Sequence, residues 1–304
     1  MPREEAARAI QEWRDLVAGP RGTLAEMRAH AEEFMAKFPV LPEVKVQHAE
    51  VGGIPGDWLT MPGVEPGRVV LYLHGGAFVF CSARGYRALG ARIAEATKAH
   101  TFVLDYRLAP EHPFPAAVDD SVAAYRGLLA LDVSPSSIVI AGDSAGGGLT
   151  MSTLLSLRDA GLPLPAGGVC ISPWVDLDCS SETMTTKADV DPVCTRESMV
   201  MEAALYLNGR STMDSLASPL YADLKGLPPL LIHVGTEETL LDDAQRLAAK
   251  AAAKGVKVEL DVFEGMPHVW HAFAEYLPEA QEAIDRIGIW VGAKMGKARH
   301  GMAI

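Results

Sequence analysis

The chain has 304 residues, of which 49% are hydrophobic and 22% are charged, as in an ordinary globular protein. A chain of this length buries about 75% of its unfolded surface, so it can form a large core without disulfides or bound metal. Its net charge of −12 argues against nucleic acid and anionic membranes as partners, because both require a basic surface.

The N-terminal segment, residues 1–45, is charged and helix-like and lacks the apolar core of a signal peptide. No uncharged apolar run approaches the roughly 20 residues that a membrane helix requires. The four cysteines include no C-x-x-C pair and no zinc-site spacing, so we expect free thiols, no metal site and a cytoplasmic location. They are Cys81, Cys170, Cys179 and Cys194.

Beyond this segment, short β-branched runs alternate with helical patterns. Several runs are continuously apolar, as expected of strands that are covered on both faces of a sheet. The predicted strands cover residues 68–73, 100–106, 137–142, 168–174, 229–235 and 258–265. The predicted helices cover residues 85–98, 144–161, 240–255 and 278–295. This alternation predicts an α/β fold with a mostly parallel sheet and helices on both faces.

Two segments interrupt the alternation, residues 1–45 and 180–215. The second contains a helical pattern that should stop at Asn208. Insertions after the strands of such a sheet tend to lie above their carboxyl ends, where ligands bind. We therefore expect both segments to form a helical cap over a pocket; packing as extra surface helices is the alternative. The remaining residues, 46–179 and 216–304, would form the catalytic domain.

A serine stands between two glycines, in Gly142-Asp143-Ser144-Ala145-Gly146, where a predicted strand meets a predicted helix. The pattern G-x-S-x-G alone is weak evidence for a nucleophile, because it occurs by chance in roughly one chain of this size in ten. At a strand-to-helix turn, however, the serine takes a strained conformation, and the glycines remove the collisions that bulkier neighbours would cause. The pattern predicts that Ser144 is a nucleophile. A phosphate-binding loop is the alternative, but neither of its glycine patterns occurs.

Acyl transfer to a serine creates an oxyanion, which needs preorganised N–H donors. The stretch His74-Gly75-Gly76-Ala77-Phe78 follows another apolar strand, and its glycines let the backbone approach a ligand closely. We therefore expect the backbone N–H groups of Gly75, Gly76 and Ala145 to form an oxyanion hole. A plain tight turn is the alternative.

A nucleophilic serine also needs a base and an acid, which in α/β hydrolases follow the serine in the order acid, then histidine. Of the later histidines, His233 lies inside an apolar strand and His300 lies in a polar tail. We expect His268 on a loop at the end of a strand, and we favour it as the base. His271 should already belong to the next helix.

The acid should follow the preceding strand, where the chain carries Glu237, Glu238, Asp242 and Asp243. We expect the two aspartates in the first turn of the next helix, where the helix dipole favours negative charge. Either glutamate could orient the imidazole and stabilise its charged form. Spacing alone does not choose between them.

Together these stretches resemble the bacterial hormone-sensitive lipase family, the cap-bearing esterases of the α/β-hydrolase superfamily. The matching sequences are YLHGGAF, DYRLAPEHPFPAAVDD, IAGDSAGGGL, SPWVDL and EGMPHVWHAF. The resemblance implies an eight-stranded α/β-hydrolase sheet with a two-part helical cap. It also implies that Ser144 is the nucleophile and His268 the general base. The family's acid motif places the acid at Glu238, where the family usually carries aspartate.

The resemblance further implies a carboxylesterase that hydrolyses short-chain esters through an acyl-enzyme and needs no cofactor. It allows a homodimer, since relatives often pair. Ala77 replaces a usual third glycine and should narrow the alcohol side of the pocket. Arg107, Glu111 and Asp119 match a structural segment of the family, and we expect them to hold the loop beneath the site. The alternatives are a non-catalytic small-molecule receptor and an amidase or acyltransferase that uses the same site.

Overall fold

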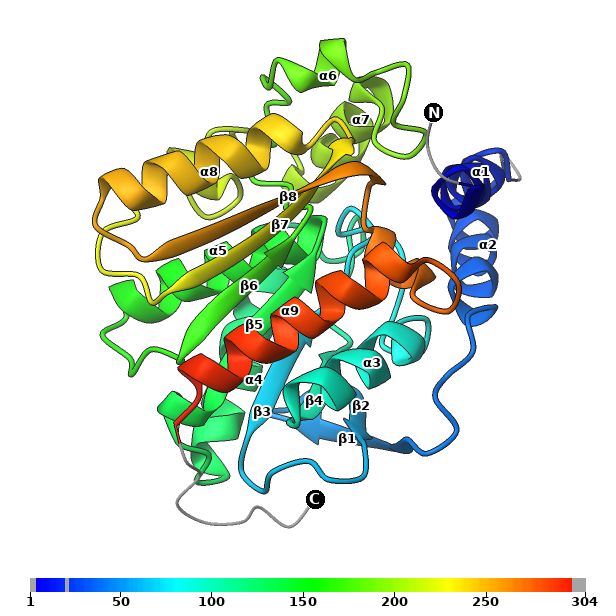
Figure 1. Cartoon of the computed structure of the whole chain (residues 1–304). Coiled ribbons are helices and arrows are strands. Elements are labelled where there is room, and N and C mark those ends of the chain that lie inside the picture. The colour runs from blue at the N-terminus through cyan, green and yellow to red at the C-terminus, as the bar shows by residue number, and fades with distance from the viewer. Residues whose placement is uncertain (1–3, 20–21, 297–304) are drawn as a thin grey trace.

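A computed structural model describes residues 4–19 and 22–296, with the elements labelled in Figure 1. The strands are β1 (Lys45–Val51), β2 (Ile54–Thr60), β3 (Val69–Leu73), β4 (His100–Leu104), β5 (Ile138–Asp143), β6 (Gly167–Ile171), β7 (Leu230–Glu237) and β8 (Val258–Pro267). The α-helices are α1 (Glu4–Val17), α2 (Leu24–Ala36), α3 (Arg87–Thr97), α4 (Ala116–Ala130), α5 (Ala145–Asp159), α6 (Thr183–Thr186), α7 (Arg196–Leu207), α8 (Leu241–Ala253) and α9 (Pro278–Lys294). Short 3₁₀ helices are η1 (Pro135–Ser137), η2 (Pro219–Tyr221) and η3 (Trp270–Phe273).

The strands of the described residues form one eight-stranded sheet in the order β1-β2-β4-β3-β5-β6-β7-β8. From β4 to β8 every neighbouring pair is parallel, whereas β1 with β2 and β2 with β4 are antiparallel. The predicted mostly parallel sheet is therefore confirmed. β3, β4, β5 and β6 are buried along their whole length, which explains their largely apolar sequences.

Helices cover both faces of the sheet, and each face has its own apolar core. α3 and α9 pack together on the face nearer the viewer in Figure 1, in a core that also includes residues of α1. α4, α5 and α8 contribute to the core of the opposite face. No helix within residues 4–19 and 22–296 combines the length and the apolar character needed to cross a bilayer.

The hairpin of β1 and β2 and the helix α4 were not predicted from the sequence. β1 lies at the edge of the sheet and most of its side chains are exposed, so its sequence lacks a buried apolar run. α4 does carry apolar residues at helical spacing, for example Ala117, Ala124 and Leu128, all of which are buried.

The insert between β6 and β7 contains α6 and α7, which lie beyond the carboxyl ends of the central strands, and α1 and α2 lie at the same end of the molecule (Figure 1). α7 stops before Asn208, which has a φ of 47°, and α8 stops before Gly255, which has a φ of 79°. Both helix ends were predicted from the sequence.

Candidate active site

Ser144 lies in the turn between β5 and α5, with φ 53° and ψ −122°. A positive φ is unfavourable for a residue with a Cβ atom, so the surroundings must hold the turn. A Cβ atom at Gly146 would collide with the carbonyl oxygen of Leu73, and one at Gly142 with the carbonyl oxygen of Gly146. The geometry thus has the strained turn and the two obligatory glycines expected from the sequence. The Ser144 hydroxyl makes no hydrogen bond with any described residue, so its contact with His268 stays a prediction.

His268 follows β8 and forms a buried pair with Glu238. Its Nδ1 lies 2.8 Å from Oε2 of Glu238, and the two residues are 3% and 0% exposed. Oε1 of Glu238 accepts the N–H of Gly235 at 2.6 Å. Glu237 points elsewhere, with Oε1 3.6 Å from Nζ of Lys187. Of the two neighbouring glutamates, the structure brings Glu238 to His268.

Nearby charges shift the titration of His268. Burial lowers the pKa of its imidazole, but the hydrogen bond and charge of Glu238 raise it, and so do the charges of Asp191 and Asp143. The net pKa lies above the ordinary value. Because Nδ1 contacts the carboxylate, Nε2 is the ring nitrogen left to exchange a proton with a substrate or nucleophile.

His233 and His271 form a second buried pair. Nδ1 of His233 lies 3.1 Å from Nε2 of His271, and both side chains are fully buried. Burial lowers the pKa of His233 to about 3 and lowers that of His271 as well. Both rings are therefore neutral core groups, in agreement with the preference for His268. His300 lies outside the described residues.

Gly75 already has a hydrogen-bond partner. Its N–H donates to Oδ1 of Asp143 at 3.2 Å, and Asp143 also accepts the hydroxyls of Tyr72 at 2.9 Å and Tyr86 at 2.8 Å. Burial raises the pKa of Asp143 to about 6. This arrangement differs from the prediction that Gly75 donates to an oxyanion, because the residue before Ser144 occupies its N–H.

The N–H groups of Gly76, Ala77 and Ala145 have no acceptor among the described residues. Gly76 has a φ of 104°, which favours glycine. Ala145 is the first residue of α5, and the first N–H groups of a helix have no partner inside it. Ala77 was not predicted as a donor, because its methyl group was the only feature that distinguished it from the glycine usual at this position.

Ser172 is a residue of the site that was not predicted from the sequence. It follows β6 with a φ of 44°, donates its hydroxyl to Oε1 of Glu238 at 2.8 Å and accepts the N–H of Val269 at 3.2 Å. Ser172 thus connects the acid to the loop that carries His268. A hydroxyl directly after a fully apolar strand is the sequence signal that could have identified it.

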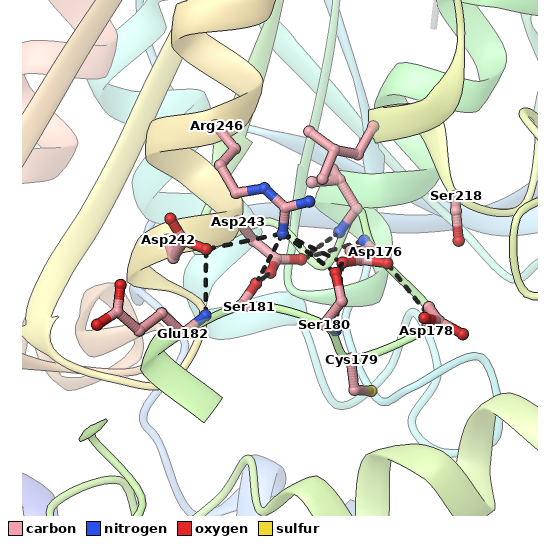
Figure 2. Close-up of polar contacts among 12 residues, drawn as sticks. Asp176, Asp178, Cys179, Ser180, Ser181, Glu182, Ser218, Asp242, Asp243 and Arg246 are labelled. Atoms are coloured by element: carbon pink, nitrogen blue, oxygen red, sulfur yellow. Dashed lines mark hydrogen bonds and ion pairs between the residues drawn. The ribbon is translucent and has the colours of Figure 1, made fainter. Parts of the chain in front are cut away.

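The first turn of α8 holds the chain that follows β6, as Figure 2 shows. Oδ2 of Asp243 accepts the N–H groups of Val175 and Asp176, each at 3.1 Å, and Oδ1 accepts the hydroxyl of Ser181. The buried Asp176 lies with Oδ2 3.2 Å from Nη1 of Arg246. Burial raises the pKa of Asp243 to about 7. Asp243 is therefore a buried structural group, beyond the helix-dipole role that the sequence predicted.

The N-terminal helices also reach the site. Nε1 of Trp13, in α1, donates to the carbonyl oxygen of His268 at 2.7 Å. The Trp13 ring stacks on Phe34 and meets Phe273 edge to face, with centroid distances of 5.3 and 5.1 Å. Trp13 lies 255 residues before His268, and no local sequence pattern indicates this contact.

The predicted loop supports are partly confirmed. Glu111 accepts two hydrogen bonds from Arg28 of α2, at 2.7 and 2.8 Å. Arg107 pairs with Asp120, with Nη2 2.7 Å from Oδ1. The prediction for Asp119 is wrong, because Asp119 is exposed and the buried Asp120 makes the contact. Successive residues of a helix face different directions.

A model of the α/β hydrolase fold family matches residues 70–272. The acetyl-hydrolase of Streptomyces hygroscopicus is 43% identical over 247 residues, which cover 81% of this chain and 82% of that protein. The putative acetyl-hydrolase LipR of Mycobacterium tuberculosis is 35% identical over 272 residues, which cover 90% of this chain and 86% of that protein.

Solved structures agree along nearly the whole chain. An esterase from the bacterial hormone-sensitive lipase family is 48% identical with a TM-score of 0.94, and the match covers 96% of this chain and 98% of that one. EstE5, in a crystal soaked with p-nitrophenyl butyrate, is 45% identical with a TM-score of 0.91 and has the same coverage, 96% and 98%.

Proposed function

Because this chain belongs to the bacterial hormone-sensitive lipase family of α/β hydrolases and is an ester hydrolase, we propose that it cleaves short-chain carboxylic esters with a triad of Ser144, His268 and Glu238. The observation that carries the proposal is the 2.8 Å contact between Nδ1 of His268 and the buried carboxylate of Glu238. This contact fixes the ring and leaves Nε2 free for the serine proton.

In the proposed reaction, Nε2 of His268 takes the proton of Ser144 as Oγ attacks the ester carbonyl. Glu238 stabilises the imidazolium that forms. The imidazolium then gives its proton to the departing alcohol, and an acyl-enzyme remains on Ser144. Water, activated by the same nitrogen, attacks the acyl group and releases the acid.

The N–H groups of Gly76 and Ala145 are the proposed donors to the oxyanion, since both lack an acceptor among the described residues. We add Ala77, whose N–H is equally unoccupied, as the third donor. Gly75 supports this loop through its bond to Asp143 rather than by touching the substrate. Each donor is worth roughly 3–4 kcal/mol to the transition state.

We further propose that residues 1–45 and 180–215 form the cap and restrict the length of the acyl chain. The two acetyl-hydrolase relatives support a short acyl group, and so does the butyrate ester used with EstE5. A cytoplasmic location and a homodimer remain predictions.

The decisive experiment compares wild type and Ser144→Ala on p-nitrophenyl acetate, butyrate, octanoate and laurate. We expect kcat in the variant to fall by about 10⁶-fold while its circular dichroism stays unchanged. In the wild type, kcat/KM should be highest for acetate or butyrate. Unaltered turnover in the variant would refute the triad, and a maximum at laurate would refute the short-chain assignment.

Two assays separate the alternatives. A fluorophosphonate probe labels only an activated serine, so labelling that disappears in Ser144→Ala excludes the receptor. Product analysis with amide substrates and with alcohol acceptors distinguishes an esterase from an amidase or an acyltransferase. The intact pair of His268 and Glu238 argues against the receptor, which should lack its base.

A further inference from the structure

The insert between β6 and β7 holds both backbone groups of the residue that follows the proposed acid. Oδ2 of Asp191 accepts the N–H of Thr239 at 2.8 Å. Oγ1 of Thr183 donates to the carbonyl oxygen of Thr239 at 2.6 Å. Thr239 is fully buried and directly follows Glu238. The insert therefore fixes the chain right next to the acid.

Asp191 is itself held rigidly. Its Oδ1 accepts the N–H groups of Val193 at 2.9 Å and Cys194 at 3.0 Å, and the residue is 3% exposed. Burying a carboxylate is costly unless its oxygens accept hydrogen bonds. No cation of the described chain pairs with Asp191, so these N–H donors, together with that of Thr239, stabilise its charge. Both oxygens of Asp191 are therefore used: Oδ1 accepts from the insert itself, and Oδ2 accepts from Thr239.

We propose that Asp191 is a positioning residue that holds Glu238 in its reacting geometry; this proposal rests on the proposed function, in which Glu238 is the acid. The peptide unit between Glu238 and Thr239 is planar, so a bond to the Thr239 N–H fixes the backbone on the carboxyl side of Glu238. Ser172 holds the side-chain carboxylate from the other direction. Asp191 and Thr183 thereby help to orient the base.

Asp191 also acts on His268 through its charge. Three carboxylates act on His268 through their charge: Glu238 after β7, Asp191 in the insert and Asp143 at the end of β5. Burial lowers the pKa of the imidazole, and all three charges raise it. Removing the charge at position 191 should therefore move the acidic limb of the kcat/KM profile to lower pH. A residue that kept the insert folded without a charge acting on His268 would leave this limb in place.

The test compares Asp191→Asn with Asp189→Asn. Asparagine at 191 keeps the shape but replaces one acceptor oxygen with an NH₂ group, which cannot accept the N–H groups around it. Asp189 lies two residues earlier and is exposed, so its variant removes the same charge from the same segment. We expect Asp191→Asn to lower kcat by about 10- to 100-fold with little change in KM, because small displacements of a catalytic group cost this much. Asp189→Asn should match the wild type in kcat and in pH profile.

A double-mutant cycle with Glu238→Gln tests whether Asp191 acts through the acid. In that background, Asp191→Asn should add less than about twofold, because no carboxylate is left to position. A loss as large as in the wild-type background would overturn the proposal. Thr183→Val, which removes the other contact to Thr239, serves if Asp191→Asn proves unfolded by circular dichroism. It should lower kcat in the same direction, and an unchanged kcat would again overturn the proposal.

The outcomes separate this proposal from the proposed function. If Ser144→Ala and Glu238→Gln abolish turnover while Asp191→Asn leaves kcat and its pH profile unchanged, only the role of Asp191 is refuted. If Glu238→Gln itself keeps full turnover, the assignment of the acid fails first.

Discussion

The base and the acid of the proposed triad are held by two parts of the chain that use different forces. Trp13 in α1 donates to the backbone of His268 and packs with Phe34 and Phe273. The buried carboxylate of Asp191, in the insert, accepts the N–H of Thr239, the residue that follows the acid. Aromatic packing depends on buried apolar area, whereas the contacts of a carboxylate depend on its charge. The two supports should therefore fail under different conditions.

Among the substitutions that probe these supports, Glu238→Gln should have the largest effect, because it removes the carboxylate that contacts Nδ1 of His268. We expect kcat to fall by about 10⁴-fold, as when the acid of a serine triad becomes an amide that favours the wrong tautomer. Glu237→Gln is the matched control, since Glu237 contacts Lys187 rather than His268. Steady-state kinetics on p-nitrophenyl butyrate measure both. A larger loss in Glu237→Gln would move the acid by one residue.

Trp13→Ala should break the aromatic support. Removing a buried tryptophan that is 6% exposed costs roughly 3–5 kcal/mol in the free energy of unfolding. Trp13→Phe keeps most of the packing and loses the hydrogen bond to the His268 carbonyl, which is worth about 1 kcal/mol. Urea unfolding at pH 6 and pH 9 should give the same loss at both values. A loss that depended strongly on pH would contradict the view of this support as apolar packing.

Asp243→Asn tests how the polar contacts at the start of the insert depend on pH, since Asp243 accepts the hydroxyl of Ser181 there. Burial raises the pKa of Asp243 to about 7, above the ordinary value of 3.8, so the native state binds this proton more tightly than the unfolded chain. The contribution of Asp243 to stability therefore falls as pH rises from about 4 to about 7. The difference in unfolding free energy, wild type minus variant, should fall by up to about 1.4 kcal/mol per pH unit. Urea unfolding at pH 5, 6 and 7 measures it, and a rising difference would refute the shift.

Arg246→Met should have the smallest effect. Arg246 is partly exposed, and its Nη1 lies 3.2 Å from Oδ2 of Asp176 and 3.6 Å from Oδ2 of Asp242. Ion pairs of this kind contribute about 0–1 kcal/mol to the free energy of unfolding. The loss of stability caused by Arg246→Met should be larger at low ionic strength than in about 0.5 M salt, where screening of charges is strong. Thermal unfolding at the two salt concentrations checks this. An equal loss in both would assign the effect to packing of the side chain.

The sequence predicted those parts of the fold that local patterns encode. The continuous apolar runs of β3 and β5 and the glycines around Ser144 depend only on neighbours in the chain, and they were identified. β1 was missed because an edge strand with exposed side chains leaves no apolar pattern. The neighbours Asp119 and Asp120 were confused because only the packing of α4 decides which of them faces Arg107.

The finer parts of the site depend on contacts between distant positions. Spacing could not choose between Glu237 and Glu238, and the family motif indicated the one that contacts His268. The bond of Gly75 to Asp143 joins residues 68 positions apart, so the backbone N–H that it occupies looked free in the sequence. Only the folded chain shows which N–H groups are left over.

The hydrogen bonds of Asp191 and Thr183 to Thr239 affect which segments can be exchanged between related enzymes to make chimeras. A chimera that exchanged residues 180–215 alone would separate these two side chains from the peptide that they hold. A chimera should therefore exchange residues 180–215 together with the stretch from Thr236 to Asp243. Crossover points outside both segments should give active hybrids more often than crossovers placed between them.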